Sequence, residues 1–184
     1  MRTSLIAIAS FLAVLASSLF GIGGTPTAEA AVNFVSWRQD VVYVQDLTAG
    51  LKKADGSPVW PVKAAAERWG EGNPVEFRYT TRPCPKGAQC VVVRQSELPA
   101  PAVGSAATGR VGSDIVSATV VLDTTFGRTN TATRRRNVVC HELGHALGLQ
   151  HRTGPGSCMT SYVTDERYPS SADVRNLVTM YGYR

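Results

Sequence analysis

Apolar residues recur along the chain with two different spacings, which predict alternating strands and helices. Short runs of alternating or β-branched apolar residues are typical of strands, and they fall at residues 41–44, 75–79, 90–94 and 117–123. Apolar residues three and four positions apart indicate helices, and they fall at residues 60–69, from 131 or 133 to 149, and from 170 or 171 onward. Residues 98–113 are rich in Ala, Gly and Pro and predict a loop, with a short edge strand near Thr108 to Val111.

The order of these elements predicts the fold class. Strands and helices alternate early in the chain, so the natural assembly is a mostly parallel sheet with packed helices, an α+β fold. Arg134, Arg135 and Arg136 fall in the first turn of the helix that begins near residue 131. The helix dipole disfavours cations there, so we expect these side chains on a solvated face, with substrate binding as the alternative.

The first 30 residues have the pattern of a secretory signal. Arg2 precedes an apolar run over residues 5–20, and Ala28 and Ala30 are the small residues that a signal peptidase recognises. A membrane anchor is the alternative, but the run is shorter than the about 20 apolar residues that span a bilayer. We therefore expect a signal peptide at residues 1–30, one domain at residues 31–184, and a secreted protein without stable membrane insertion.

Charge and cysteine content narrow the classes of function. The net charge of +5 favours solubility and is compatible with anionic substrates or cell-wall polymers. The sequence has no basic stripe interleaved with aromatics, which argues against nucleic acid as a partner. Four cysteines in a secreted chain indicate two disulfides, and the cysteines are Cys84, Cys90, Cys140 and Cys158. We expect a monomer.

The sequence HELGHALGLQH at residues 141–151 carries the main candidate chemistry. His141 and His145 are four residues apart, so on a helix their side chains lie about 40° apart around the axis and can bind one metal ion. Gly148 can adopt a left-handed conformation that ends the helix, and the turn then brings His151 to the same ion. Imidazole nitrogens suit zinc, and three protein ligands leave a fourth position open, as in catalytic sites.

Glu142 supplies the second component of this chemistry. It lies beside the histidines on the predicted helix, near enough to reach a metal-bound water without binding the metal. Zinc lowers the pKa of such a water to about 7, and Glu142 would accept its proton as general base and return it to the leaving amine. All three histidines of the chain fall within the motif. The pattern therefore predicts amide hydrolysis with one catalytic zinc ion and no covalent intermediate.

The motif resembles the zinc signature of the metzincin metallopeptidases, which have a methionine in a tight turn downstream. Met159, within GSCMT at residues 156–160, is similar to that methionine, and residues 169–182 resemble the closing helix of the matrixin branch. The resemblance is strong over residues 137–184 and rests on element order upstream. It implies a zincin fold: a twisted, mostly parallel sheet, two long helices of which one carries the motif, and a small C-terminal subdomain with the methionine turn and the final helix.

The residues around the motif indicate where substrate and disulfides lie. Substrate would extend along an edge strand, for which Thr108 to Val111 is the candidate. We expect the disulfides Cys140–Cys158, which would tie the zinc helix to the methionine turn, and Cys84–Cys90. Tyr162 would either bind substrate or pack. The resemblance implies that the pocket for the residue after the scissile bond is lined by Ser161, Tyr162, Val163 and Thr164.

Some features depart from the matrixins. The sequence has no cysteine-switch segment and no histidine for a second, structural zinc, and its acidic residues form no dense calcium loop, so a calcium requirement stays open. Arg152, directly after the third histidine, matches none of the subfamily signatures. The leading interpretation is a secreted zinc endopeptidase acting on proteins or peptides. The alternatives are a catalytically silent zinc-containing binding module and a hydrolase of cell-wall peptides.

Overall fold

The computed structural model describes residues 35–125 and 129–182, within a compact unit that spans Asn33–Arg184. The expected signal peptide, residues 1–30, lies outside the described residues and stays a prediction. None of the helices in the described part of the chain has the length and apolar character needed to span a bilayer.

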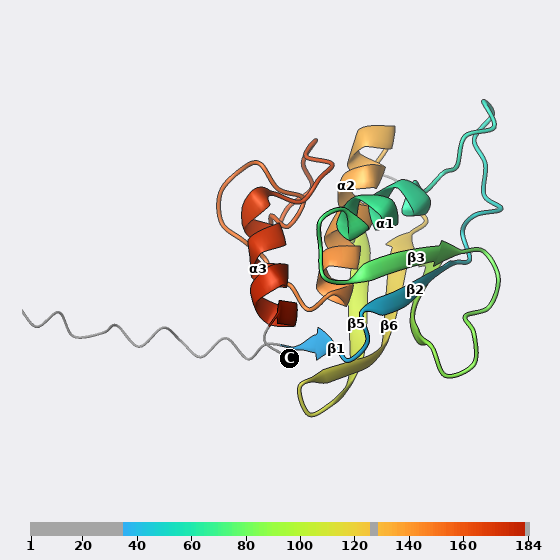
Figure 1. Ribbon diagram of the computed structural model, residues 1–184. Coiled ribbons are helices and arrows are strands. Elements are labelled where there is room, and N and C mark those ends of the chain that lie inside the picture. The colour runs from blue at the N-terminus through green and yellow to red at the C-terminus, as the bar shows by residue number, and fades with distance from the viewer. Residues whose placement is uncertain (1–34, 126–128, 183–184) are drawn as a thin grey trace, which may run out of the picture. The chain divides into compact units, whose positions relative to one another are not determined.

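One mixed sheet forms the centre of the fold (Figure 1). Its order is β1, β6, β4, β2, β3, and β5 pairs with β6. Every pair is parallel except that of β5 with β6, which confirms the mostly parallel sheet. The strands are β1 (Ser36–Trp37), β2 (Val41–Asp46), β3 (Glu76–Thr80), β4 (Gln89–Ser96), β5 (Gly104–Val111) and β6 (Asp114–Asp123).

Three helices accompany the sheet: α1 (Val62–Gly70), α2 (Ala132–Ala146) and α3 (Ser171–Gly182). Figure 1 shows α1 and α2 on the same face of the sheet and α3 beside them. Two buried tryptophans hold α2 in place, because a buried indole N–H needs an acceptor. Trp69 of α1 donates to the carbonyl oxygen of Cys140, and Trp37 of β1 donates to that of Ala146, both at 2.8 Å. The helix that carries the motif is therefore fixed at its middle and at its end.

Side-chain caps define where α2 and α3 begin. The hydroxyl of Thr131 accepts a hydrogen bond from the backbone N–H of Arg134 at 3.1 Å, so Thr131, and not Thr133, is the N-cap of α2. Ser170 and Asp173 form a reciprocal capping pair, in which the Ser170 hydroxyl accepts from the Asp173 N–H at 3.2 Å and the Asp173 carboxylate accepts from the Ser170 N–H at 2.6 Å.

The prediction for residues 98–113 is wrong in its extent. β5 begins at Gly104, whereas the sequence indicates a loop there and an edge strand only near Thr108 to Val111. Gly, Ser and Ala have low β-propensity, so the segment has no local strand signal. Antiparallel pairing with β6, from Gly104 opposite Leu122 to Val111 opposite Asp114, makes it a strand.

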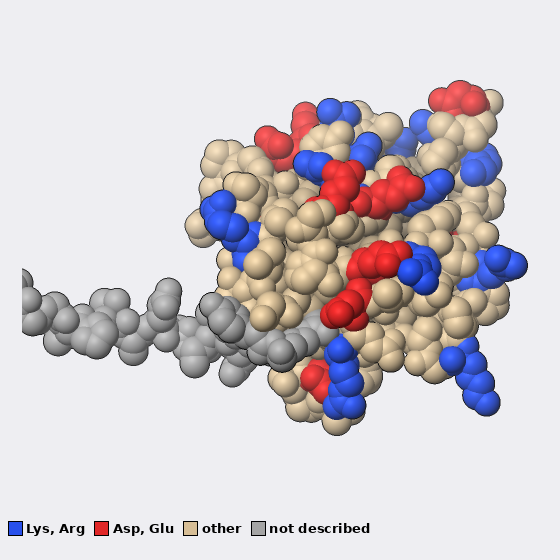
Figure 2. Space-filling model, viewed as in Figure 1, with Lys and Arg blue, Asp and Glu red and all other residues tan. Residues whose placement is uncertain are grey.

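The prediction of a solvated face for the arginine run is wrong for its middle member. Arg135 is buried, and its guanidinium donates to the carbonyl oxygens of Thr129 and Asn130 at 3.0 and 3.1 Å. Arg134 is exposed, and Arg136 is half-buried. Figure 2 shows acidic side chains among the basic ones on the face that it presents, so the positive charge is not gathered into one basic surface there.

Candidate metal-binding site

The structure gathers the three histidines of the motif. His141 and His145 are one turn apart on α2, and their Nε2 atoms lie 3.0 Å from each other. His151 follows the helix, and its Nε2 atom lies 3.1 Å from that of His141. Gly148 makes the turn between them, with a φ of +94° that favours glycine. The ligand atoms of the three histidines lie within 4.8 Å of one another and can hold a metal ion.

Hydrogen bonds fix which nitrogen is free in the first two rings. Nδ1 of His141 lies 2.8 Å from the carbonyl oxygen of Cys158, and Nδ1 of His145 lies 2.8 Å from that of Leu149. A carbonyl oxygen only accepts, so each Nδ1 carries the proton and each Nε2 keeps a lone pair. Burial lowers the pKa of His141 to about 4 and also lowers the pKa of His145, which keeps both rings neutral.

This arrangement fits a zinc ion. Two Nε2 lone pairs that face each other at 3.0 Å share no proton, so they repel unless a cation lies between them. Tetrahedral zinc, with bonds of about 2.0–2.1 Å to imidazole, holds two nitrogens about 3.3 Å apart, close to the observed spacing. Neutral imidazoles that donate their other N–H to a carbonyl are typical zinc ligands.

Glu142 is buried beside the histidines, with 6% of its surface exposed. Burial raises the pKa of Glu142 to about 8, and a cation held by the histidines would act in the opposite direction. The space for its side chain depends on Gly104 of β5, because a Cβ at that position would lie 2.7 Å from Oε1 and 2.8 Å from Cγ of Glu142. The glycine at the start of β5 therefore lets the strand pass close to the carboxylate.

Met159 packs against α2 beneath the histidines and is fully buried. Gly144, next to His145, makes this packing possible. A Cβ on Gly144 would lie 2.3 Å from Sδ of Met159 and 2.8 Å from Cζ2 of Trp69. The glycine within the helix thus allows a close approach that any side chain would prevent.

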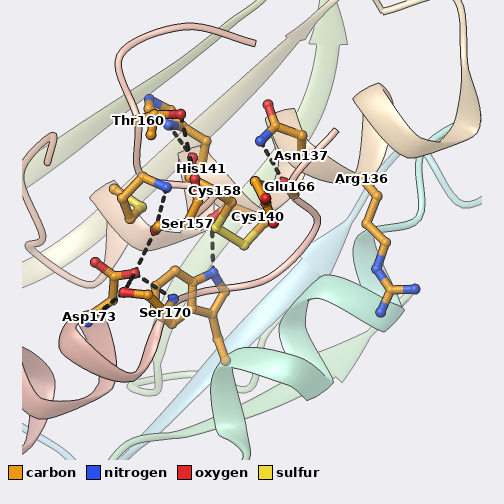
Figure 3. The surroundings of a disulfide bond; sticks show 12 residues. Arg136, Asn137, Cys140, His141, Ser157, Cys158, Thr160, Glu166, Ser170 and Asp173 are labelled. Carbon is orange, nitrogen blue, oxygen red and sulfur yellow. Dashed lines mark hydrogen bonds between the residues drawn. A yellow bond between two sulfur atoms is a disulfide. The ribbon is translucent and has the colours of Figure 1, made fainter. Parts of the chain in front are cut away.

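The disulfide Cys140–Cys158 joins α2 to the methionine turn directly beside His141 (Figure 3). Cys158 also provides the carbonyl oxygen that His141 contacts, so the bond holds a residue that orients a candidate ligand. Cys84–Cys90 is the second disulfide, and no cysteine is free. Both bonds join the pairs expected from the sequence.

The histidines and Glu142 open into a cleft of about 510 Å³. It is lined by residues 101–106, which include the start of β5, and by residues 160–163. Ser161, Tyr162 and Val163 therefore line the cleft, and Tyr162 is 63% exposed, whereas Thr164 does not line it. The part of β5 at the cleft begins at Gly104, so the edge expected at Thr108 to Val111 lies beyond it.

Asn137 belongs to the site although it was not predicted from the sequence. It is buried on α2, lines the cleft, and donates to the Thr164 hydroxyl at 3.2 Å. It also donates to the carbonyl oxygen of Glu166 at 2.6 Å (Figure 3). Its own carbonyl oxygen accepts from the N–H of Thr164. Asn137 thereby fixes the segment after the methionine turn. Its only signal in the sequence is a polar residue one turn before His141.

A histidine triad that can hold a metal, with a buried glutamate beside it in an open cleft, is typical of metallopeptidases. A model of the matrixin family matches residues 48–182. The chain therefore belongs to the matrixin family of metallopeptidases.

Comparison with curated proteins gives no match. A solved structure described as the GM1-bound form of the ECX AB5 holotoxin is similar in fold, with 14% sequence identity and a TM-score of 0.53. The match covers 77% of this chain and 80% of that chain. At this identity the likeness concerns the fold alone.

Proposed function

We propose that the chain is a secreted zinc endopeptidase that hydrolyses peptide bonds with His141, His145 and His151 as zinc ligands and Glu142 as general base. The observation that carries this proposal is the convergence of unprotonated Nε2 atoms at a cleft that also contains a buried glutamate. The mature protein would comprise residues 31–184, after removal of the signal peptide, and would act outside the cell as a monomer.

The residues of the site have distinct tasks in this proposal. The chemistry that a bound zinc ion supplies is Lewis acidity, which acidifies a water molecule and polarises the carbonyl group of the scissile bond. Glu142 accepts the proton of the attacking water on its carboxylate and donates it to the nitrogen of the leaving amine. Met159 and the Cys140–Cys158 bond keep α2 and the following turn in a fixed arrangement, so the three rings need no rearrangement during the reaction.

The free edge of β5 would bind the substrate. Among the described strands, β5 pairs with β6 alone, so its other edge has backbone groups available for an added peptide strand. Its first residues, Gly104 to Ala106, lie along the cleft. Tyr162 and Val163, which also line the cleft, would contact the residue after the scissile bond.

The experiment that tests the proposal uses residues 31–184 with zinc content measured alongside cleavage. We expect one zinc per chain, cleavage of casein within the chain rather than from its ends, and loss of cleavage on chelation that added zinc restores. Cleavage of peptidoglycan peptides without cleavage of casein would show that the substrates are cell-wall peptides and not proteins. Zinc binding without cleavage of either would indicate a binding module, and a protein that binds no zinc would contradict the proposal.

Gly104→Ala tests whether β5 positions the general base. The added methyl would lie 2.7 Å from Oε1 of Glu142, and a misplacement of about 1 Å lowers activity about 100-fold, whereas zinc content should not change. Gly109→Ala is the matched control, because it lies on the same strand and its Cβ would instead meet the Ser117 hydroxyl. Equal losses in both variants would show that the contact with Glu142 is not the cause.

A further inference from the structure

The three histidines are not held in the same way. His141 and His145 each direct Nδ1 at a backbone carbonyl oxygen 2.8 Å away. His151 is the most exposed of the three, and among the described residues no protein group accepts a hydrogen bond from its Nδ1. An outer hydrogen bond normally fixes the orientation of a metal-binding imidazole. The backbone contacts next to His151 therefore bear directly on the placement of its ring.

The backbone at His151 is held through the next residue. The N–H of Arg152 donates to the carbonyl oxygen of Met159 at 3.0 Å, and Arg152 forms an isolated parallel bridge with Thr160. These contacts join the third histidine to the methionine turn. They form an isolated bridge outside the named strands, so few backbone hydrogen bonds hold this segment.

The guanidinium of Arg152 reaches the start of α3. Its Nη1 donates to the Ser170 hydroxyl at 2.6 Å and lies 3.3 Å from Oδ1 of Asp173. The Asp173 side chain is 4% exposed, and that of Arg152 is 31% exposed. The pair is thus largely shielded from solvent, where ion pairs are stronger than at an open surface.

Asp173 also holds the methionine turn. Its Oδ2 accepts from the hydroxyl of Ser157 at 2.6 Å, and the Ser157 hydroxyl accepts from the N–H of Met159 at 2.9 Å. Figure 3 shows Asp173 between Ser157 and Ser170, on the side of the disulfide away from Asn137. One buried carboxylate therefore joins the turn beneath the histidines, the start of α3 and the residue after His151.

We propose that Arg152 is a positioning residue that holds His151 through the Arg152–Asp173 pair, in place of the hydrogen bond that this histidine lacks. This proposal rests on one part of the proposed function, the binding of zinc by the three histidines, and does not depend on peptidase activity. Loss of the guanidinium frees the segment at His151 while the contacts of His141 and His145 remain. Removal of such an outer partner typically weakens metal binding about 10- to 100-fold.

The test compares zinc dissociation from the wild type, Arg152→Gln and Arg152→Lys, measured by transfer to a competing chelator. We expect a loss of affinity of about 10- to 100-fold for Arg152→Gln and a smaller loss for Arg152→Lys, because an ammonium keeps the charge but not the geometry. The visible spectrum of the cobalt-substituted protein should also change in Arg152→Gln, because the third ligand is less constrained. Arg38→Gln is the matched control, since Arg38 pairs with Asp114 at an exposed position.

A double-mutant cycle shows whether Arg152 acts through Asp173. In an Asp173→Asn background, Arg152→Gln should cause little further loss of zinc affinity. An unchanged dissociation rate and cobalt spectrum in Arg152→Gln, with only a lower unfolding free energy of the metal-free protein, would overturn the proposal. A wild type that binds no zinc would overturn both this inference and the proposed function, so the two failures are distinguishable.

Discussion

Glu142→Gln is expected to lower peptidase activity about 100- to 10,000-fold, the range that a general base contributes, while zinc binding stays intact. The amide has the size of the carboxylate but accepts no proton. The group of residues that can hold a metal consists of the three histidines without Glu142. Turnover of a protein substrate and zinc content per chain, measured on the same preparations, separate these two properties.

The fold should tolerate this substitution. Glu142 is buried with 6% of its surface exposed, and a neutral amide of similar size costs less free energy to bury than a charged carboxylate. Glu76→Gln is the control, because Glu76 forms an exposed ion pair with Arg78 on β3. Activity retained in Glu142→Gln would show that another group takes the proton. Loss of zinc together with activity would show that Glu142 helps to assemble the site.

The sequence predicts the parts of this site that depend on short-range spacing. Residues four apart share a helix face, so His141 and His145 meet wherever that helix forms. Gly148 turns the chain only three residues before His151. This short connection restricts the positions that the His151 ring can take. The methionine turn with Met159 follows eight residues after His151. Cys158 of this turn forms a disulfide with Cys140, which directly precedes the first histidine.

The features of the site that the sequence does not predict depend on which distant segments of the chain become neighbours. Gly104 lies in β5 because β6 pairs with it, and its proximity to Glu142, distant in sequence, has no local signal. Arg135 is buried, and its guanidinium donates to two carbonyl oxygens of the preceding turn, a feature that helix periodicity does not report. Asn137 contacts Thr164 only after the final segment has folded back onto α2. Each of these depends on which distant segments become neighbours.

Gly148→Ala is expected to destabilise the fold by about 3 kcal/mol, from left-handed strain of about 1–2 kcal/mol and overpacking of about 1–3 kcal/mol. The strain arises because Gly148 has a φ of +94°. The overpacking arises because a Cβ there would lie 2.1 Å from the carbonyl oxygen of Val35 and 3.0 Å from Cε of Met180. A backbone carbonyl cannot rotate away as a flexible side chain does. Chemical denaturation of the metal-free protein measures this loss.

Zinc affinity should fall as well in Gly148→Ala. A shift of the backbone at this position would also move the next residues, which place two of the three histidine rings. Leu149 provides the carbonyl oxygen that orients His145, and His151 follows two residues later. Gly154→Ala is the matched control: Gly154 has a φ of +86° but nothing within 4 Å of an added Cβ. We expect it to lose about 1 kcal/mol from strain alone and to bind zinc as the wild type does. Equal effects in the two variants would show that backbone strain, without the contact to Val35, accounts for the role of Gly148.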